Sequence, residues 1–184
     1  NKTPVKSEVR ISTKMKYIID TIKDEKRKTI IFCSFLSEMD MFETFLKEEG
    51  FKVGRIDGSV APAKRISIID TADNIDVMIV QIDAGGTGLN MTKFNRVFIT
   101  SPSWNPCIEL QAIARAHRIG QKNKVKVSKI ILVSNTQDFL TIDELIRNKQ
   151  EYKRDIIETT LNDDTYFDGI QRRNVNKNIR SLLK

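Results

Sequence analysis

No run of 18 consecutive apolar residues occurs in the 184-residue sequence, and its first residues contain no apolar signal segment. Because a membrane-spanning helix needs about 20 such residues, we expect neither membrane insertion nor secretion. Cysteine is scarce as well: Cys33 and Cys107 stand in unrelated contexts, and neither belongs to a CxxC pair. We therefore expect no disulfide framework and no zinc site, and a reducing, intracellular compartment fits this composition.

Two common phosphate-binding signatures are also missing. The sequence contains neither a G-x-x-x-x-G-K-[ST] phosphate loop nor a G-x-G-x-x-G dinucleotide fingerprint. It does carry an excess of positive charge, with a net charge of +7. Residues 171–184 hold five basic and no acidic side chains, and residues 121–130 hold four lysines. Such a surface suits a polyanion such as nucleic acid, although a solvated face with a polar tail would have the same composition.

Short apolar runs alternate with helical patterns over most of the chain, which predicts an α/β fold with a mostly parallel central sheet. The predicted strands are 29–33, 53–56, 77–80, 96–100 and 126–133. The predicted helices are 13–24, one that Ser37 caps and that ends at Gly50, one through Arg65 and Ile69, and 106–119. Beyond Thr136 the strand pattern stops, and residues 139–159 form a long charged helical pattern. We expect two parts, a lobe of residues 1–135 and a helical extension with a basic tail, 136–184.

The most informative stretch is SPSWNPCIELQAIARAHRIGQ, residues 101–121. Asn105 is suited to cap a helix that Pro106 opens, and Gly120 suits the position just after its end. At 100° per residue, three polar side chains fall within about 60° of one another on this helix. They are Gln111, Arg115 and Arg118.

Two arginines on one face can bind a polyphosphate, because each planar guanidinium donates to two phosphate oxygens at once. An ordinary surface helix with solvated arginines would give the same spacing. Leu110, Ile113 and His117 occupy a different face, which predicts a buried stripe and a packed histidine.

A glycine-rich loop, QIDAGGTGLNM at residues 81–91, follows the predicted strand that ends at Val80. Glycines let backbone N–H groups approach a ligand or another chain closely. Many turns between a strand and a helix have a similar composition, so the loop alone does not specify a function.

Four segments together resemble the ordered motifs of the C-terminal lobe of superfamily-two helicases. They are IIFCSF (30–35), GRIDGSVAPAKR (54–65), DAGGTGLNM (83–91) and WNPCIELQAIARAHRIGQ (104–121). The combination of WNP with QAIARAHRIGQ resembles the Swi/Snf branch of chromatin remodellers and repair translocases. The resemblance covers roughly residues 10–158. It implies a RecA-like three-layer sandwich followed by a C-terminal helical extension.

In this family, ATP and Mg²⁺ lie between two RecA-like lobes, and the first lobe supplies the phosphate loop and the magnesium ligands. The resemblance implies that Arg115 and Arg118 are catalytic arginine fingers that reach the γ-phosphate, and that Gln111 supports them. It places the glycine-rich loop at the interface with ATP and the first lobe, through Gly85, Gly86, Gly88 and Asn90. Since this chain has no phosphate loop, we expect it to be inactive alone.

The resemblance also implies contacts with double-stranded DNA, bare or nucleosomal, through Ser34, Arg55, Gly58 and Trp104. Turn chemistry would equally explain Ser34 and Gly58, and packing would explain Trp104. The implied protein is a DNA translocase that works with its own N-terminal lobe. We expect it in the nucleus, or in the cytoplasm if its source is viral or bacterial. A strand-separating helicase and a catalytically inactive nucleic-acid-binding scaffold remain as alternatives, although a scaffold has no need for Arg115 and Arg118 on one face.

Overall fold

Five short strands form one parallel sheet, in the order β2-β3-β1-β4-β5, in a computed structural model that describes residues 11–84, 88–136 and 139–161. The strands are β1 (Thr29–Cys33), β2 (Val53–Ile56), β3 (Val77–Gln81), β4 (Arg96–Ile99) and β5 (Lys126–Lys129). Strands β1, β3 and β4 lie in the middle and are almost wholly buried, which explains their continuous apolar sequences. Strand β5 is four residues shorter than predicted: its pairing with β4 ends at Lys129, and a last hydrogen bond runs from the N–H of Ile130 to the carbonyl of Ile99 at 2.9 Å.

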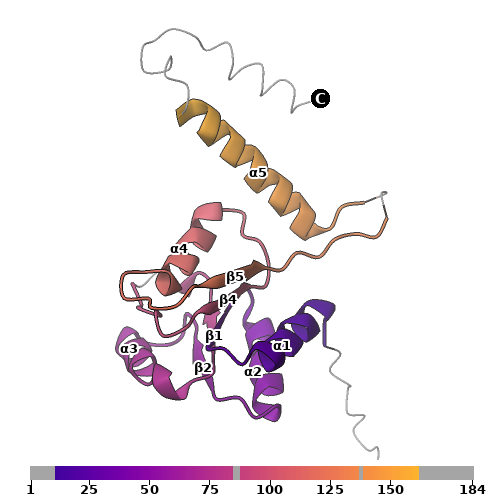
Figure 1. Cartoon of the computed structure of the whole chain (residues 1–184). Helices are drawn as coiled ribbons and strands as arrows, with labels where there is room; N and C mark the ends of the chain where they lie inside the picture. The colour runs from indigo at the N-terminus through magenta and orange to yellow at the C-terminus, as the bar shows by residue number, and fades with distance from the viewer. Residues whose placement is uncertain (1–10, 85–87, 137–138, 162–184) are drawn as a thin grey trace, which may run out of the picture. The chain divides into compact units, whose positions relative to one another are not determined.

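Helices cover both faces of this sheet, so the fold has three layers (Figure 1). Helices α1 (Thr13–Glu25) and α2 (Leu36–Glu48) lie on one face, and α3 (Pro62–Asp70) and α4 (Pro106–Ala116) lie on the other. A 3-10 turn, η1 (Ala72–Asn74), precedes β3. The sheet has one apolar cluster on each face, and successive residues of β1 alternate between them. Ile31 packs in the cluster with α1 and α2, whereas Phe32 packs in the cluster on the side of α3 and α4. The predicted RecA-like α/β fold is confirmed.

The helix ends show which local signals operate. Ser12 caps α1, because its side chain accepts from the backbone N–H of Met15. The prediction that Ser37 caps α2 was wrong: α2 begins at Leu36, and Phe35 occupies the cap position without a side-chain hydrogen bond. Gly50 follows α2 with a φ of 84°, a left-handed conformation that favours glycine.

The chain divides into two compact units, Asn1–Leu132 and Val133–Lys184. The second contains helix α5 (Ile142–Leu161). Thr141 and Glu144 cap its start reciprocally: the Thr141 hydroxyl accepts from the Glu144 N–H, and the Glu144 carboxylate accepts from the Thr141 N–H at 2.8 Å. This capping box explains why the helix begins at Ile142 rather than at the predicted Phe139. The basic tail lies outside the described residues, and no described helix is long and apolar enough to cross a membrane.

Candidate nucleotide and nucleic-acid interface

The loops that follow the parallel strands meet at one edge of the sheet, as they must when all strands run in the same direction. Ser34 follows β1, Gly58 follows β2, Gly88 lies in the loop after β3, and Trp104 lies in the loop after β4. This carboxyl edge is where open α/β sheets bind their ligands. Four residues from four separate sequence motifs therefore lie along one edge.

Helix α4 starts as predicted. Pro106 occupies its first turn, and the Asn105 side chain accepts from the backbone N–H of Cys107 at 3.0 Å. The helix ends at Ala116, three residues before the predicted end. Gln121 stabilises this end, because its side-chain amide donates to the carbonyls of Ala116 and Phe94 at 3.1 and 2.9 Å.

The early end of α4 changes the predicted arginine face. Gln111 and Arg115 lie one turn apart on the helix, with Gln111 exposed and Arg115 half-buried. Arg118 lies beyond the end of the helix, so the helical rotation of 100° per residue does not predict where its side chain points. Its position depends instead on the turn that ends near Gly120, where φ is 101°.

The glycine-rich loop and the arginines do meet in the structure. The backbone N–H of Met91 donates to the carbonyl of Arg115 at 3.0 Å, and Nη1 of Arg118 donates to the carbonyl of Gly88 at 3.4 Å. Gly88 has a φ of 61°, and a side-chain Cβ at this position would meet nothing within 4 Å. Its left-handed backbone, not crowding, therefore favours glycine there.

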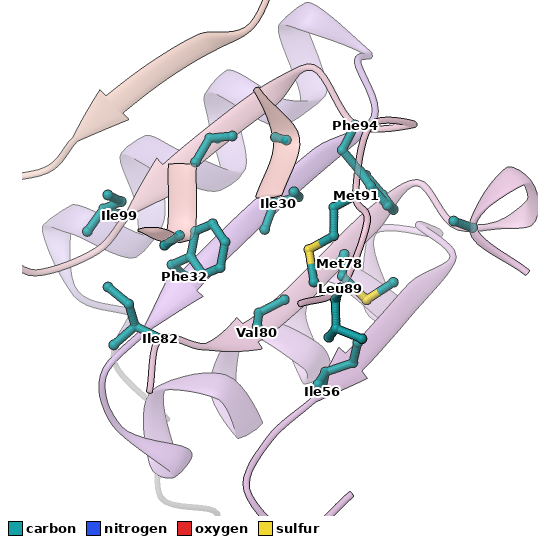
Figure 2. Packing of buried hydrophobic residues seen from close by; sticks show 14 of the residues in the cluster. Ile30, Phe32, Ile56, Met78, Val80, Ile82, Leu89, Met91, Phe94 and Ile99 are labelled. Carbon is teal, nitrogen blue, oxygen red and sulfur yellow. The ribbon is translucent and has the colours of Figure 1, made fainter. Parts of the chain in front are cut away.

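The other loop residues named from sequence are placed only in part. Asn90 is exposed, and its side chain accepts from the backbone N–H of Thr92 at 3.2 Å. Gly85 and Gly86 lie outside the described residues. Leu89 and Met91 anchor the loop, because both are buried in the apolar cluster with Met78 (Figure 2).

The predicted buried stripe of α4 was wrong at two of its three positions: Ile113 is half-buried and packs against the apolar cluster, but the other two are not buried. Leu110 is 61% exposed, and His117 is also exposed. The buried face is made of small side chains and one acid: Ala112, Ala116 and Glu109. Alanines let the helix pack closely on the sheet, and the bulkier Leu110 points away from it. His117 instead lines a surface pocket of about 470 Å³ beside Arg118.

Glu109 is a residue that the sequence pattern did not single out. Its side chain is fully buried, its Oε1 accepts from the backbone N–H of Ser103 at 2.7 Å, and its Oε2 pairs with Nζ of Lys129 at 2.5 Å. This carboxylate therefore ties the loop that carries Trp104 to α4 and to the end of β5. Trp104 itself is 56% exposed.

Arg55, predicted to bind DNA, is engaged with three carboxylates. Its guanidinium contacts Asp40 at 2.5 Å, Asp57 at 2.9 Å and Glu43 at 3.1 Å. These partners, Asp40 above all, raise the pKa of Arg55, and the Ser59 hydroxyl and then Arg55 lower the pKa of Asp57. A DNA phosphate would have to replace one of the carboxylates, so the role of Arg55 stays a prediction.

Ser34 and Gly58 have different surroundings. Ser34 is half-buried next to Glu38, a carboxylate that accepts from the Thr100 hydroxyl at 3.0 Å and whose pKa is raised by burial. Gly58 is exposed, and its backbone N–H donates to Oε1 of Gln81 at 2.9 Å. Both residues thus present backbone or small polar groups at the carboxyl edge.

The chain belongs to the family of the helicase conserved C-terminal domain, whose model matches residues 13–120. It is 32% identical over 163 residues to the ATP-dependent helicase rhp16 of Schizosaccharomyces pombe, a match that covers 84% of this chain and 18% of that protein. It is 34% identical over 157 residues to the helicase-like transcription factor of Mus musculus, with 82% and 15% covered.

A solved structure is similar as well. The C-terminal part of the Fun30 ATPase domain superposes with a TM-score of 0.62 at 26% identity, covering 78% of this chain and 54% of that one. The resemblance to the C-terminal lobe of superfamily-two, Swi/Snf-type proteins is therefore confirmed. The chain spans less than a fifth of the length of these curated relatives.

Proposed function

We propose that the chain is the second motor lobe of an ATP-dependent translocase on double-stranded DNA. The observation that carries the proposal is the contact between Arg118 and Gly88, together with the bond between Met91 and Arg115. These contacts bring both arginines beside the glycine-rich loop, at the end of α4 where Gln121 also bonds the carbonyl of Phe94, just before β4. ATP turnover would then take place at the end of α4, and DNA contact at the carboxyl edge that carries Ser34, Gly58 and Trp104.

Arg115 and Arg118 would act as the arginine fingers. A guanidinium that reaches the γ-phosphate stabilises the negative charge that spreads over its oxygens during phosphoryl transfer. Arg118 is exposed and bonded only weakly to Gly88, at 3.4 Å, so it can turn toward a nucleotide without breaking the fold. Gln111, exposed one turn before Arg115, would orient the same site.

The arginines and the glycine-rich loop are suited to bind the triphosphate of ATP rather than Mg²⁺. Among the described residues, no group of three histidine, cysteine or acidic side chains could hold a metal ion. We therefore propose that Mg²⁺, which would neutralise charge on the β- and γ-phosphates, is held mainly by acidic residues of a first lobe. For the same reason this chain by itself would be inactive.

The DNA side of the proposal rests on weaker contacts. Ser34 and Gly58 would meet the sugar-phosphate backbone, Arg55 would pair with a phosphate, and the exposed Trp104 would contact the duplex. A net charge of +7 favours such contacts. The names of the relatives, an ATP-dependent helicase and a helicase-like transcription factor, support a nuclear location.

The test is a pair of assays on the protein that contains both its lobes. Displacement of a third strand from duplex DNA reports translocation, and release of one strand from a forked duplex reports unwinding. We expect ATP-dependent displacement without strand release. Strand release would favour a strand-separating helicase, and the absence of any DNA-stimulated ATP hydrolysis would favour a scaffold.

A further inference from the structure

Arg65 is a buried arginine that none of the proposed site residues explains. It lies in the first turns of α3, is 8% exposed, and is the buried residue of a helix whose other side chains are exposed or half-buried. A buried guanidinium must be fully hydrogen-bonded, because an unpaired buried charge is very costly. Its partners therefore indicate what the residue does.

One set of partners belongs to the turn after β2. Nε of Arg65 donates to the carbonyl of Val60 at 2.7 Å, and Nη2 donates to the carbonyls of Asp57 and Gly58 at 3.1 and 3.4 Å. Three of the four carbonyls of residues 57–60 thus point at one guanidinium. This turn carries Gly58, the proposed DNA contact.

A further partner belongs to the loop after β3. Nη1 of Arg65 donates to the carbonyl of Ala84 at 3.2 Å. A second bond joins the same two segments, since the N–H of Gly58 donates to Oε1 of Gln81 at 2.9 Å. The loop after Ala84 leads to Gly88, whose carbonyl accepts from Arg118.

Only an arginine can make these contacts together. Its planar fork presents donors in fixed directions, whereas a lysine ammonium is a single point of charge. If either loop moved alone, a buried donor would lose its acceptor. The two loops are therefore restrained to move together.

We propose that Arg65 is a positioning residue that locks the turn at 57–60 to the loop after β3 and so couples DNA contact to the arginine fingers. The proposal rests on the proposed function for the roles of Gly58 and Arg118. Its structural half, the lock between the two loops, does not depend on that function.

The structural half is tested on this chain by amide hydrogen exchange. We compare wild type, Arg65→Lys and, as a matched control, Lys64→Met, which removes an exposed charge from the same helix. In Arg65→Lys, exchange should become at least about tenfold faster at the amides of Gly58 and Val60, in the turn after β2, and at the amide of Ile82, in the loop after β3. A tenfold change corresponds to the free energy of about one charge-assisted hydrogen bond. Lys64→Met should leave all three unchanged. Faster exchange in only one of the two loops would overturn the lock.

The functional half uses the two-lobed protein. The ratio of DNA-stimulated to DNA-free ATP turnover should fall by about fivefold or more in Arg65→Lys, the lower range of coupling between two sites. A residue that only supports the fold would lower the melting temperature and leave this ratio unchanged, which would overturn the coupling. If Arg65→Lys fails to fold, Gln81→Leu removes the second bond between the same loops and must lower the ratio. If wild type shows no DNA stimulation at all, the proposed function fails, while the exchange result still decides whether Arg65 locks the loops.

Discussion

Replacing Glu109 should destabilise the lobe more than any exposed change on α4. The side chain is 0% exposed and joins Ser103 at 2.7 Å to Lys129 at 2.5 Å. Breaking a buried ion pair from one side costs about 3–5 kcal/mol. The side chain of Lys129 is 37% exposed, so its ammonium can turn to water, and the lower end of that range applies. We therefore expect Glu109→Ala to lose about 3 kcal/mol of unfolding free energy.

The assay is urea unfolding together with a melting curve. A loss of about 3 kcal/mol should lower the melting temperature by roughly 10 °C in a domain of this size. Glu109→Gln keeps an oxygen for the Ser103 N–H and should lose less. Leu110→Ala, the exposed neighbour, should change the free energy by no more than about 0.5 kcal/mol. If Glu109→Ala were as stable as Leu110→Ala, the buried carboxylate would not hold the Trp104 loop.

Four further predictions concern activity, DNA and pH. The chain alone should hydrolyse no ATP, and turnover that stays with the protein through successive columns would refute this. Its binding to duplex DNA should be weak and independent of sequence, with log affinity falling against log salt by about 0.9 per neutralised phosphate; an affinity insensitive to salt would contradict it. The hydrogen bond from Lys126 lowers the pKa of Glu25, so Glu25→Gln should destabilise the fold at neutral pH; the difference should begin to shrink as the pH falls below the ordinary glutamate value of 4.5 and should vanish below the lowered pKa. Burial raises the pKa of Glu38, so Glu38→Gln should instead stabilise the fold near neutral pH and lose that advantage in acid. Unfolding curves measured at several acidic and neutral pH values give the change in unfolding free energy of each variant, which should be opposite in sign for the two at neutral pH.

Local signals predicted the sheet well. The bounds of β1 and β2 are those expected from the sequence, because both segments are too short for a helix and contain β-branched residues. The start of α4 followed from Asn105 and Pro106, whose effects on backbone geometry are local. The end of α4 did not, because Gln121 reaches back to Ala116 and Phe94 through a turn that the helical pattern does not reveal.

The polar residues inside the fold were the ones that the sequence did not reveal. Glu109 and Arg65 each lie on a helix at a position where a charged side chain ordinarily faces solvent. Their burial depends on partners distant in sequence, Lys129 for one and Ala84 for the other. The same cause misplaced Leu110 and His117, since the face that packs on the sheet is set by alanines and an acid rather than by the largest apolar side chains.

Arg118→Ala, assayed by DNA-stimulated phosphate release in the two-lobed protein, tests the arginine-finger assignment most directly. Arg118 is exposed and its side chain makes one long hydrogen bond, to Gly88 at 3.4 Å, so the variant should keep its melting temperature and DNA affinity. Turnover should fall by about 10³–10⁵, the usual effect of losing such a finger. Arg118→Lys should restore little, because an ammonium lacks the forked geometry, and Lys122→Ala, an exposed charge nearby, should be neutral. Retention of more than about a tenth of wild-type turnover would contradict the assignment and favour a scaffold.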